Sequence, residues 1–407
     1  MKHFLTIAAV ACSVMGSLHA ADWPTYQHDN RRSGITTEQL NAANLAQSWV
    51  FVSKSRPQPA WRGKMARDSY AKRTFQGDSF DYDKAFNLIA ADGKVFFGST
   101  SANACIALDD SNGNVVWQVP VGGAVRVAPA YDGDKVYFGS DDGQAYCVNA
   151  DTGAKLWSYR GGPSDTLIGS DHKFVSRFPC RTGVLVQGGS AYCGFGLLTW
   201  HGNYMAKLDA TTGAEQQKTL RNGSAYSFEG PILADSNNIY VTQGKNTPAA
   251  FSLSAVSHLG NFSGCGGTYA TITAAGKLFH GPGHNTSNRT DHITESTASS
   301  RSLTTRHDHL SRIIVSGSNS YKILRDAVTA SGGVTWTQAM EKPVTMILGG
   351  TTLYVGARAK VIAIDTATGN VLKILNVQGD AYSLALANGK LFASTTMGKV
   401  YCFEGQP

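Results

Sequence analysis

The sequence predicts an all-β protein, a single β-propeller built from four-stranded antiparallel blades. One observation is a module that occurs twice within residues 87–157, with Gly113 and Trp117 recurring 40 residues later as Gly153 and Trp157. A second is that each copy holds four short apolar runs, rich in β-branched and aromatic residues and too short for helices. A third is that turns with Gly after Asp or Thr separate these runs. Four strands at this period are typical of one propeller blade.

Residues 1–20 have the pattern of an export signal. Lys2 and His3 precede an apolar core, FLTIAAVACSVM, and the segment ends in small residues at Ala20. The core is shorter than a membrane span, and we expect no span elsewhere. We therefore expect an exported protein that is periplasmic, outer-membrane-associated or secreted, with residues 21–407 as its propeller. Lipidation at Cys12 is left open.

The mature chain opens with a lead-in, residues 21–44, followed by a lone strand at residues 45–51. This strand has no hairpin partner nearby, so we expect it to complete the last blade and close the ring. Seven blades are then expected, at about 87–117, 127–157, 181–217, 229–259, 268–336, 344–374 and 382–403. Eight blades stay possible if the insertions hide strands, and residues 268–336 are the least regular unit.

Four insertions interrupt the repeats, at residues 52–86, 158–180, 196–203 and 281–312. In a propeller whose strands run a to d from the axis outward, the d–a and b–c connections share one face. All four insertions are such connections, so we expect them on one face, which we call the elaborated face. The opposite, plain face carries the short a–b and c–d turns. Long loops on a rigid scaffold are a common place for binding sites.

Charged residues stand at the start of three successive strands a, on the channel rim of the elaborated face: Arg126, Arg181 and Glu229. Two guanidiniums beside a carboxylate would orient an anionic or carboxylate-bearing ligand. A structural ring of ion pairs is the alternative interpretation. Trp200, His201 and Trp61 are further candidate contacts on this face, where they would line a sugar pocket.

Metal and redox chemistry have little support in the sequence. His307 and His309 are weak candidate metal ligands, and solvated loop histidines are the alternative. The six cysteines beyond the export signal are even in number, but their pairing is left open, and the hairpin register would place Cys193 opposite Val184. The absence of a Cys-x-x-Cys-His motif excludes a c-type haem. The formal net charge of +7 is scattered along the chain, which argues against a nucleic-acid partner.

A tail of the form Ala-x-Asp-x-x-Thr-Gly-x-x-x-Trp recurs at several blades. The tryptophans that we expect to dock between blades are Trp49, Trp117, Trp157 and Trp336. This tail resembles the tryptophan-docking motif of the PQQ-like, quinoprotein-type β-propeller repeat. The chain is similar to the exported bacterial proteins of that class that include the BamB-like family.

The resemblance implies two kinds of function. Quinoprotein dehydrogenases of this repeat class use PQQ with Ca²⁺ and a disulfide between adjacent cysteines, and this chain has no adjacent cysteines. We therefore predict an exported, non-catalytic propeller without a cofactor that binds a cell-envelope protein, peptide or polysaccharide through its elaborated face. The alternatives are a PQQ- and Ca²⁺-dependent oxidoreductase acting on alcohols or sugars, and a carbohydrate-binding protein.

Overall fold

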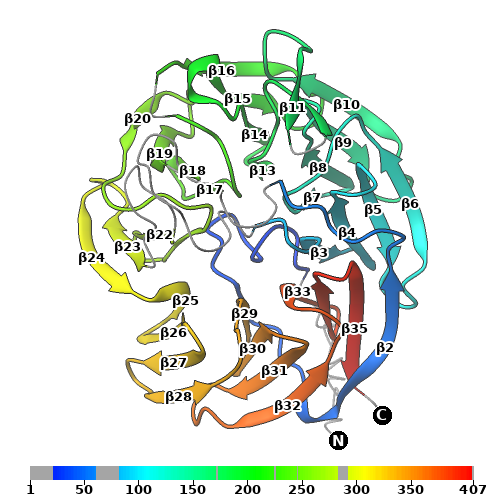
Figure 1. Cartoon of the computed structure of the whole chain (residues 1–407), viewed down its shortest axis with the longest axis vertical. Coiled ribbons are helices and arrows are strands. Elements are labelled where there is room, and N and C mark those ends of the chain that lie inside the picture. Colours follow the sequence, from blue (N-terminus) through cyan, green and yellow to red (C-terminus); the bar gives the residue numbers. More distant parts are fainter. Residues whose placement is uncertain are drawn as a thin grey trace, which may run out of the picture.

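The computed structural model describes residues 22–60, 82–170, 173–223, 226–244, 246–282 and 292–405. Eight antiparallel sheets stand around a central axis, so the predicted β-propeller is confirmed (Figure 1). The expected export signal, residues 1–20, lies outside the described residues. Within the described ranges, no helix combines the length and hydropathy needed to cross a membrane.

The first four blades follow one another along the chain. Blade 1 holds β3 (Leu88–Ala91), β4 (Lys94–Ser99), β5 (Ala104–Asp109) and β6 (Val115–Pro120). Blade 2 holds β7 (Ala130–Asp132), β8 (Lys135–Gly139), β9 (Gln144–Asn149) and β10 (Lys155–Arg160). Blade 3 holds β13 (Val184–Gln187), β14 (Ser190–Phe195), β15 (Asn203–Asp209) and β16 (Glu215–Arg221). Blade 4 holds β17 (Leu233–Ala234), β18 (Asn238–Gln243), β19 (Asn246–Ser252) and β20 (His258–Asn261).

The second half of the ring has the same order. Blade 5 holds β21 (Ala270–Ile272), β22 (Lys277–His280), β23 (His292–Thr297) and β24 (Leu303–Asp308). Blade 6 holds β25 (Leu310–Ser316), β26 (Asn319–Leu324), β27 (Ala327–Ser331) and β28 (Trp336–Ala339). Blade 7 holds β29 (Thr345–Gly349), β30 (Thr352–Ala357), β31 (Lys360–Asp365) and β32 (Val371–Asn376). Blade 8 holds β33 (Ala381–Ala387), β34 (Lys390–Thr395), β35 (Lys399–Gly405) and, from the chain start, β2 (Leu45–Val52).

The blade count is eight, the possibility that the sequence left open, because residues 268–336 form two blades. The segment 281–312, expected to be one b–c insertion, contains β23 and β24, the two outer strands of blade 5. Residues 294–297 alternate as a strand does, since Thr294 and Ser296 are buried whereas Glu295 and Thr297 are not. Many serines, threonines and histidines mask this alternation in the sequence.

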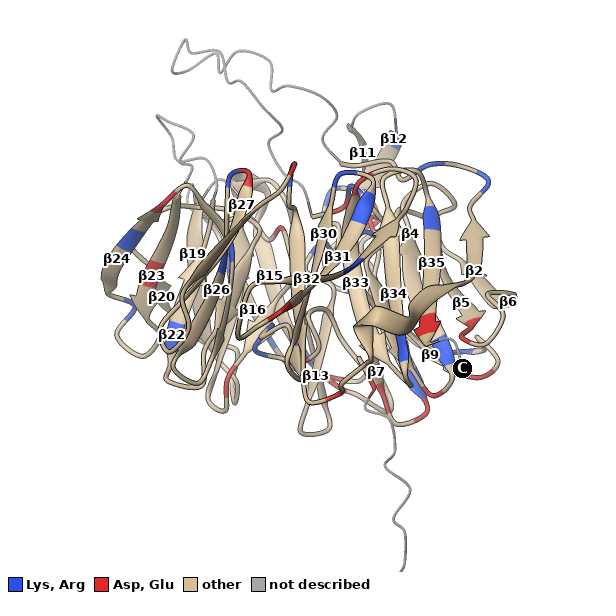
Figure 2. Cartoon of the chain, turned by 90° about the horizontal axis from the view of Figure 1, so that it is seen from below, with Lys and Arg blue, Asp and Glu red and all other residues tan. Residues whose placement is uncertain are grey.

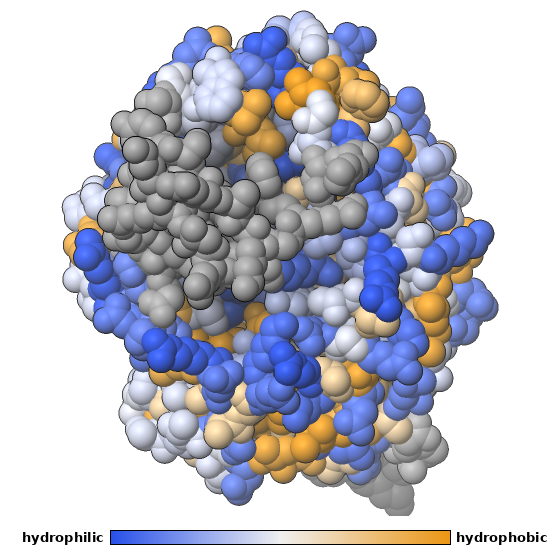
Figure 3. Space-filling view, viewed as in Figure 1, coloured by the Kyte–Doolittle hydropathy of each residue, from blue (hydrophilic) through white to orange (hydrophobic). Residues whose placement is uncertain are grey.

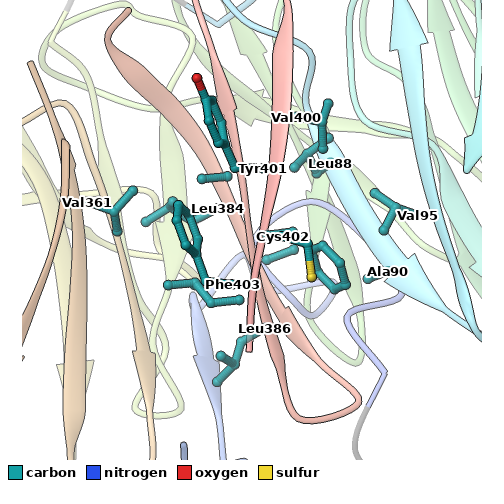
Figure 4. Close-up of a cluster of buried hydrophobic side chains, with 14 of the residues drawn as sticks. Leu88, Ala90, Val95, Val361, Leu384, Leu386, Val400, Tyr401, Cys402 and Phe403 are labelled. Carbon is teal, nitrogen blue, oxygen red and sulfur yellow. The ribbon is translucent and has the colours of Figure 1, made fainter. Parts of the chain in front are cut away.

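Strand β2 closes the ring by pairing antiparallel with β35, as predicted, with Trp49 opposite Cys402. Alternate residues of β35 then face different neighbours. Val400 and Cys402 point toward blade 1, where Leu88 lies, whereas Phe403 points toward Val361 of blade 7 (Figure 4). The hydrophobic core is therefore a set of layers between blades, and no blade buries its own faces alone.

The lead-in crosses the channel mouth on the plain face, where strands a end in the a–b turns. Its backbone exchanges hydrogen bonds with Ala90 of blade 1, and it continues past blades 2, 4, 5 and 7. There its carbonyls accept from the amides of Tyr131, Ala234 and Ile272, and its Gly34 carbonyl accepts from the Leu348 amide. Two short elements end the lead-in: β1 (Ile35–Thr36), which pairs parallel with β29, and a 3₁₀ turn, η1 (Ala42–Asn44).

A buried arginine fastens the lead-in to blade 4. The Arg32 guanidinium donates to the Ile232 carbonyl from Nε at 2.9 Å and from Nη2 at 2.7 Å. Its Nη1 donates to the Thr25 hydroxyl at 2.7 Å. Burial lowers the pKa of Arg32 to about 10. Nothing in the sequence indicated that the lead-in would form the floor of the channel mouth, because its contacts join it to strands far along the chain.

Candidate functional site

The long connections lie on the face that the propeller order predicts for them. The d–a connection between blades 2 and 3 carries an extra hairpin, β11 (Leu167–Ser170) paired with β12 (Lys173–Ser176). Viewed from the side, this hairpin stands above one edge of the ring (Figure 2). The b–c connection of blade 3 forms a 3₁₀ turn, η2 (Thr199–His201), on the same side. Of the insertions at 52–86 and 281–312, residues 61–81 and 283–291 lie outside the described residues.

Large apolar side chains are exposed on these two connections. Phe174 of β12 is 75% exposed, Trp200 of η2 is 74% exposed, and Leu167 of β11 is 56% exposed. Apolar surface is visible around the hairpin in the face-on view (Figure 3). The sequence analysis named Trp200 but missed the hairpin, although the run KFVS within a polar insertion was a signal for a strand.

The hairpin is attached to the ring beneath it through backbone contacts. The Ser176 amide donates to the Asp141 carbonyl at 2.7 Å, which joins β12 to blade 2. The Lys173 ammonium donates to the Thr100 carbonyl of blade 1 at 2.8 Å. These contacts join the hairpin to blade 2 at its base, through Ser176, and to blade 1 beside its turn, through Lys173.

Directly below lies a chain of buried ion pairs, which we call the rim network: Asp83, Arg126, Asp141, Arg181 and Glu229, with Tyr82. Asp141 stands at its centre and accepts from Arg126 Nε at 2.7 Å and from Arg181 Nε at 2.8 Å. Arg126 Nη1 also donates to Asp83 at 2.7 Å, and Arg181 Nη1 lies 3.4 Å from Glu229. The Tyr82 hydroxyl donates to Glu229 at 3.2 Å.

The charges of the rim network hold one another in their ionised forms. Burial by itself raises the pKa of Asp141, but Arg126 and Arg181 outweigh it and hold that pKa below its ordinary value. Burial likewise acts to lower the pKa of Arg181, and the nearby Asp141 raises it above its usual range. Burial and the neighbouring Glu229 raise the pKa of Tyr82 well above its ordinary value, so its hydroxyl stays protonated and donates.

The network also fixes the two ends of the segment around residues 58–86 to the rim. Arg126 Nη1 donates to the Gln58 carbonyl at 3.0 Å, and the Ala60 amide donates to Asp83 at 2.8 Å. The Asn87 amide group donates to the carbonyls of Tyr82 and Arg126 at 2.7 and 3.0 Å. The network therefore joins blades 2, 3 and 4 to this segment.

The structure brings the predicted rim residues together. They form buried ion pairs, which is the alternative interpretation that the sequence offered. Arg126, Arg181 and Glu229 are 6%, 1% and 3% exposed, and Asp83 and Asp141, which the sequence analysis did not name, bind the guanidiniums. Their function as ligand contacts stays a prediction. Asp141 had no motif to mark it, because it lies in a b–c turn and one of its two arginine partners, Arg181, comes from blade 3.

The other candidate residues are dispersed. His201 packs edge-on against Trp200, with ring centroids 5.9 Å apart, and burial lowers the pKa of His201. Trp61 lies outside the described residues. His307 Nε2 lies 2.9 Å from Glu295, while His309 contacts Arg325, so the two candidate metal ligands have different partners.

A site for PQQ with Ca²⁺ would need oxygen ligands for the metal ion. No group of three His, Cys, Asp or Glu side chains suited to a metal ion occurs within the described ranges. The carboxylates at the channel rim are already bound by arginines. All six cysteines in the described part of the chain are free and buried, and Cys193 lies opposite Val184, as the register predicted.

The four docking tryptophans share one contact. Each indole Nε1 donates to a backbone carbonyl in the next blade, at 2.8–3.0 Å: Trp49 to Asp110, Trp117 to Ala150, Trp157 to Ala210 and Trp336 to Thr366. Each ring also lies against the glycine of the repeat tail in that blade: Gly113, Gly153, Gly213 and Gly369. The repeat tail is thus a joint between blades, which explains its recurrence without reference to chemistry.

Comparison with known proteins supports this architecture. Residues 58–259 match the family model described as outer membrane protein assembly factor BamB. A stretch of 75 residues is 37% identical to outer membrane protein assembly factor BamB of Shewanella oneidensis, covering 18% of this chain and 19% of that protein. A stretch of 69 residues is 32% identical to tetrathionate hydrolase of Acidithiobacillus ferrooxidans, covering 17% of this chain and 14% of that protein. The matches thus span less than a fifth of either relative.

Two solved structures extend the likeness around the ring. Quinohemoprotein alcohol dehydrogenase from Comamonas testosteroni superposes with a TM-score of 0.66 at 12% identity, over 95% of this chain and 81% of that one. A europium-containing methanol dehydrogenase superposes with a TM-score of 0.63 at 11% identity, over 94% and 98%. At such identities the likeness concerns the fold alone. The repeat tail, the eight-bladed ring and the family match together identify the chain as a PQQ-like β-propeller repeat protein.

Proposed function

We propose that this protein is an exported, non-catalytic scaffold that binds a cell-envelope protein through its elaborated face. The observation that carries the proposal is the exposure of Phe174, Trp200 and Leu167 on two connections of that face. Aromatic side chains are enriched in protein interfaces, where their burial supplies much of the binding energy. The matches to proteins named outer membrane protein assembly factor favour an envelope partner.

The rim network supports this function by making the binding surface rigid. Asp141 binds two arginines through its side chain and the hairpin through its carbonyl. The exposed Phe174 and Leu167 therefore stand on a hairpin that is joined to a buried, charge-paired base. A rigid surface loses less conformational entropy when a partner binds.

Affinity capture from envelope extracts tests the proposal. Phe174→Ser and Trp200→Ser remove the exposed rings, while Ile374→Ser removes an exposed apolar side chain, 50% exposed, from the outer strand of blade 7. Envelope proteins captured by the parent protein and by Ile374→Ser, but lost with the two ring variants, would support the elaborated face. An identical captured set for all four proteins would contradict it.

The competing function is that of a PQQ-dependent oxidoreductase. It is considered because the chain has the fold of an alcohol dehydrogenase and a methanol dehydrogenase. Titration of the protein with PQQ and Ca²⁺, followed by a dye-linked alcohol oxidation assay, separates the two. Saturable quinone binding with turnover would overturn the scaffold. Because this assay needs no partner protein, its result is independent of the capture experiment.

A further inference from the structure

On the plain face, a groove surrounds the lead-in residues His28–Arg31. It consists of three adjoining cavities of about 430, 490 and 340 Å³, all of which Asp29 lines. Arg31 lines the first and second, and Asn30 the second and third. All three volumes fall within the range of about 300–1,000 Å³ that is usual for small-molecule sites. We call the whole the channel-mouth groove.

The walls of the channel-mouth groove come from five successive blades. They are the ends of strands a and the a–b turns around residues 130–132, 186–187, 234–236, 271–276 and 315–317. The floor is the lead-in, which Arg32 fastens to blade 4. A site built on strand ends and a pinned segment is held in position before a ligand arrives.

The lining is rich in hydroxyl groups, and its three carboxylates, Asp29, Asp132 and Asp235, outnumber its one cation, Arg31. Its hydroxyls come from Ser33, Thr36, Thr37, Thr271, Thr273 and Ser316. Ile35, Ile272 and Val315 add apolar surface in the same cavity. Burial lowers the pKa of His28, so this ring is neutral at pH 7.

Three of the four charged side chains of the groove, Asp29, Arg31 and Asp235, contact partners within the protein. Asp29 accepts from the Ser33 amide and hydroxyl at 3.0 and 2.7 Å. Arg31 lies 3.8 Å from Asp29, and its side chain is 46% exposed. Asp235 accepts from the Tyr240 hydroxyl at 2.6 Å. A free anion would meet three carboxylates, and two of these, Asp29 and Asp235, already accept from protein donors, so the lining suits a neutral ligand with hydroxyl groups best.

We propose that the channel-mouth groove binds a neutral saccharide. A sugar offers hydroxyls that both donate and accept, which suits hydroxyl side chains, and C–H faces that suit Ile35 and Ile272. The Arg31–Asp29 pair places a planar donor beside a planar acceptor, an arrangement that can bind neighbouring sugar hydroxyls with charge-assisted hydrogen bonds. This site is on the opposite face from Trp200 and His201, and it goes beyond the scaffold function.

Isothermal titration with cellobiose, maltose and chitobiose, and with the acidic sugar galacturonate, tests the proposal. Ala274 is exposed and lines two of the cavities, so Ala274→Trp should fill the groove and abolish binding. Ala275→Trp is the matched control, because Ala275 is exposed in the same turn and is not part of the lining. Arg31→Ala should weaken binding by about ten-fold, the effect of losing one charge-assisted hydrogen bond. Thermal unfolding verifies that each variant is folded.

Saturable binding of at least one neutral disaccharide that is lost in Ala274→Trp and kept in Ala275→Trp would support the site. The proposal is overturned if no neutral disaccharide binds, if both tryptophan variants behave alike, or if galacturonate alone binds. None of these outcomes depends on an envelope protein, so failure here leaves the scaffold function untouched.

Discussion

The indole ring of Trp49 lies directly on Gly113, so that a Cβ added to this glycine would be 2.5 Å from a ring carbon. Trp49 belongs to the strand that closes the ring, and Gly113 to the repeat tail of blade 1. The same indole donates to the Asp110 carbonyl at 2.9 Å. The joint that recurs between successive blades is therefore also used where the chain start meets blade 1.

Gly113→Ala should weaken this joint. Gly113 has φ +75°, a left-handed conformation that costs a non-glycine residue about 1–2 kcal/mol, and the added methyl group would also displace Trp49. Gly93→Ala in the same blade is the control, because Gly93 has φ +68° but meets nothing within 4 Å. We expect Gly113→Ala to lower the free energy of unfolding by about 1–3 kcal/mol more than Gly93→Ala does. Urea unfolding followed by tryptophan fluorescence measures both, and equal losses would show that the ring contact is unimportant.

Asp141→Asn should destabilise the rim network, because two buried guanidiniums would lose the carboxylate that they share. Breaking a buried ion pair by removing one partner costs about 3–5 kcal/mol. Asp151→Asn removes a carboxylate from an exposed pair with Lys94 at 2.8 Å, and such pairs contribute about 0–1 kcal/mol. The difference between the two variants in thermal or urea unfolding tests the expectation. Comparable stabilities would mean that the arginines find other acceptors.

The free energy of unfolding should decrease as the pH is lowered from 6.5 to 4, and His280 should account for part of this decrease. This side chain is fully buried in blade 5, and burial lowers its pKa from 6.5 to about 4. The folded state therefore keeps the ring neutral while the unfolded chain takes up a proton below pH 6.5. The contribution of His280 to the free energy of unfolding is therefore complete above pH 6.5 and is lost as the pH falls through 4.

For a shift of this size the loss is about 3 kcal/mol. Unfolding free energies of the parent protein and of His280→Gln, each measured at pH 7 and pH 4.5, give the test. The variant cannot titrate at this position, so its stability should fall less between the two pH values. The other histidines contribute equally to both proteins. An identical fall in the two proteins would contradict the prediction.

The repeat pattern was sufficient to predict a β-propeller, but it was not sufficient to predict the number of its blades. Regular modules such as residues 87–157 alternate clearly between apolar and polar positions, and they predicted blades, turns and docking tryptophans. The prediction of a single blade over residues 268–336 was wrong, because the outer strands of blade 5 are rich in serine, threonine and histidine. Thr294 and Ser296, for example, are buried without being apolar. A pattern based on hydropathy cannot recognise such a strand.

The sequence predicted only part of the candidate site, because the repeat register reveals some of its residues and not others. Register alone aligned Arg126, Arg181 and Glu229, since equivalent positions of successive blades are neighbours around the ring. Asp83 and Asp141 escaped notice because each lies in a loop and accepts from an arginine 40 or more residues away, although Asp141 also accepts from Arg126, 15 residues away. Phe174 became a candidate only through its exposure.

What the sequence determined by itself was the local repeat: four strands, tight turns and a Trp–Gly joint, which follow from spacing and turn chemistry. Tertiary structure alone decided how the units meet across the ring. It placed the lead-in under the channel mouth, paired the rim arginines with Asp141, and left Phe174 and Trp200 exposed. These outcomes depend on which side chains from distant blades come within hydrogen-bonding distance, and a one-dimensional pattern carries no such information.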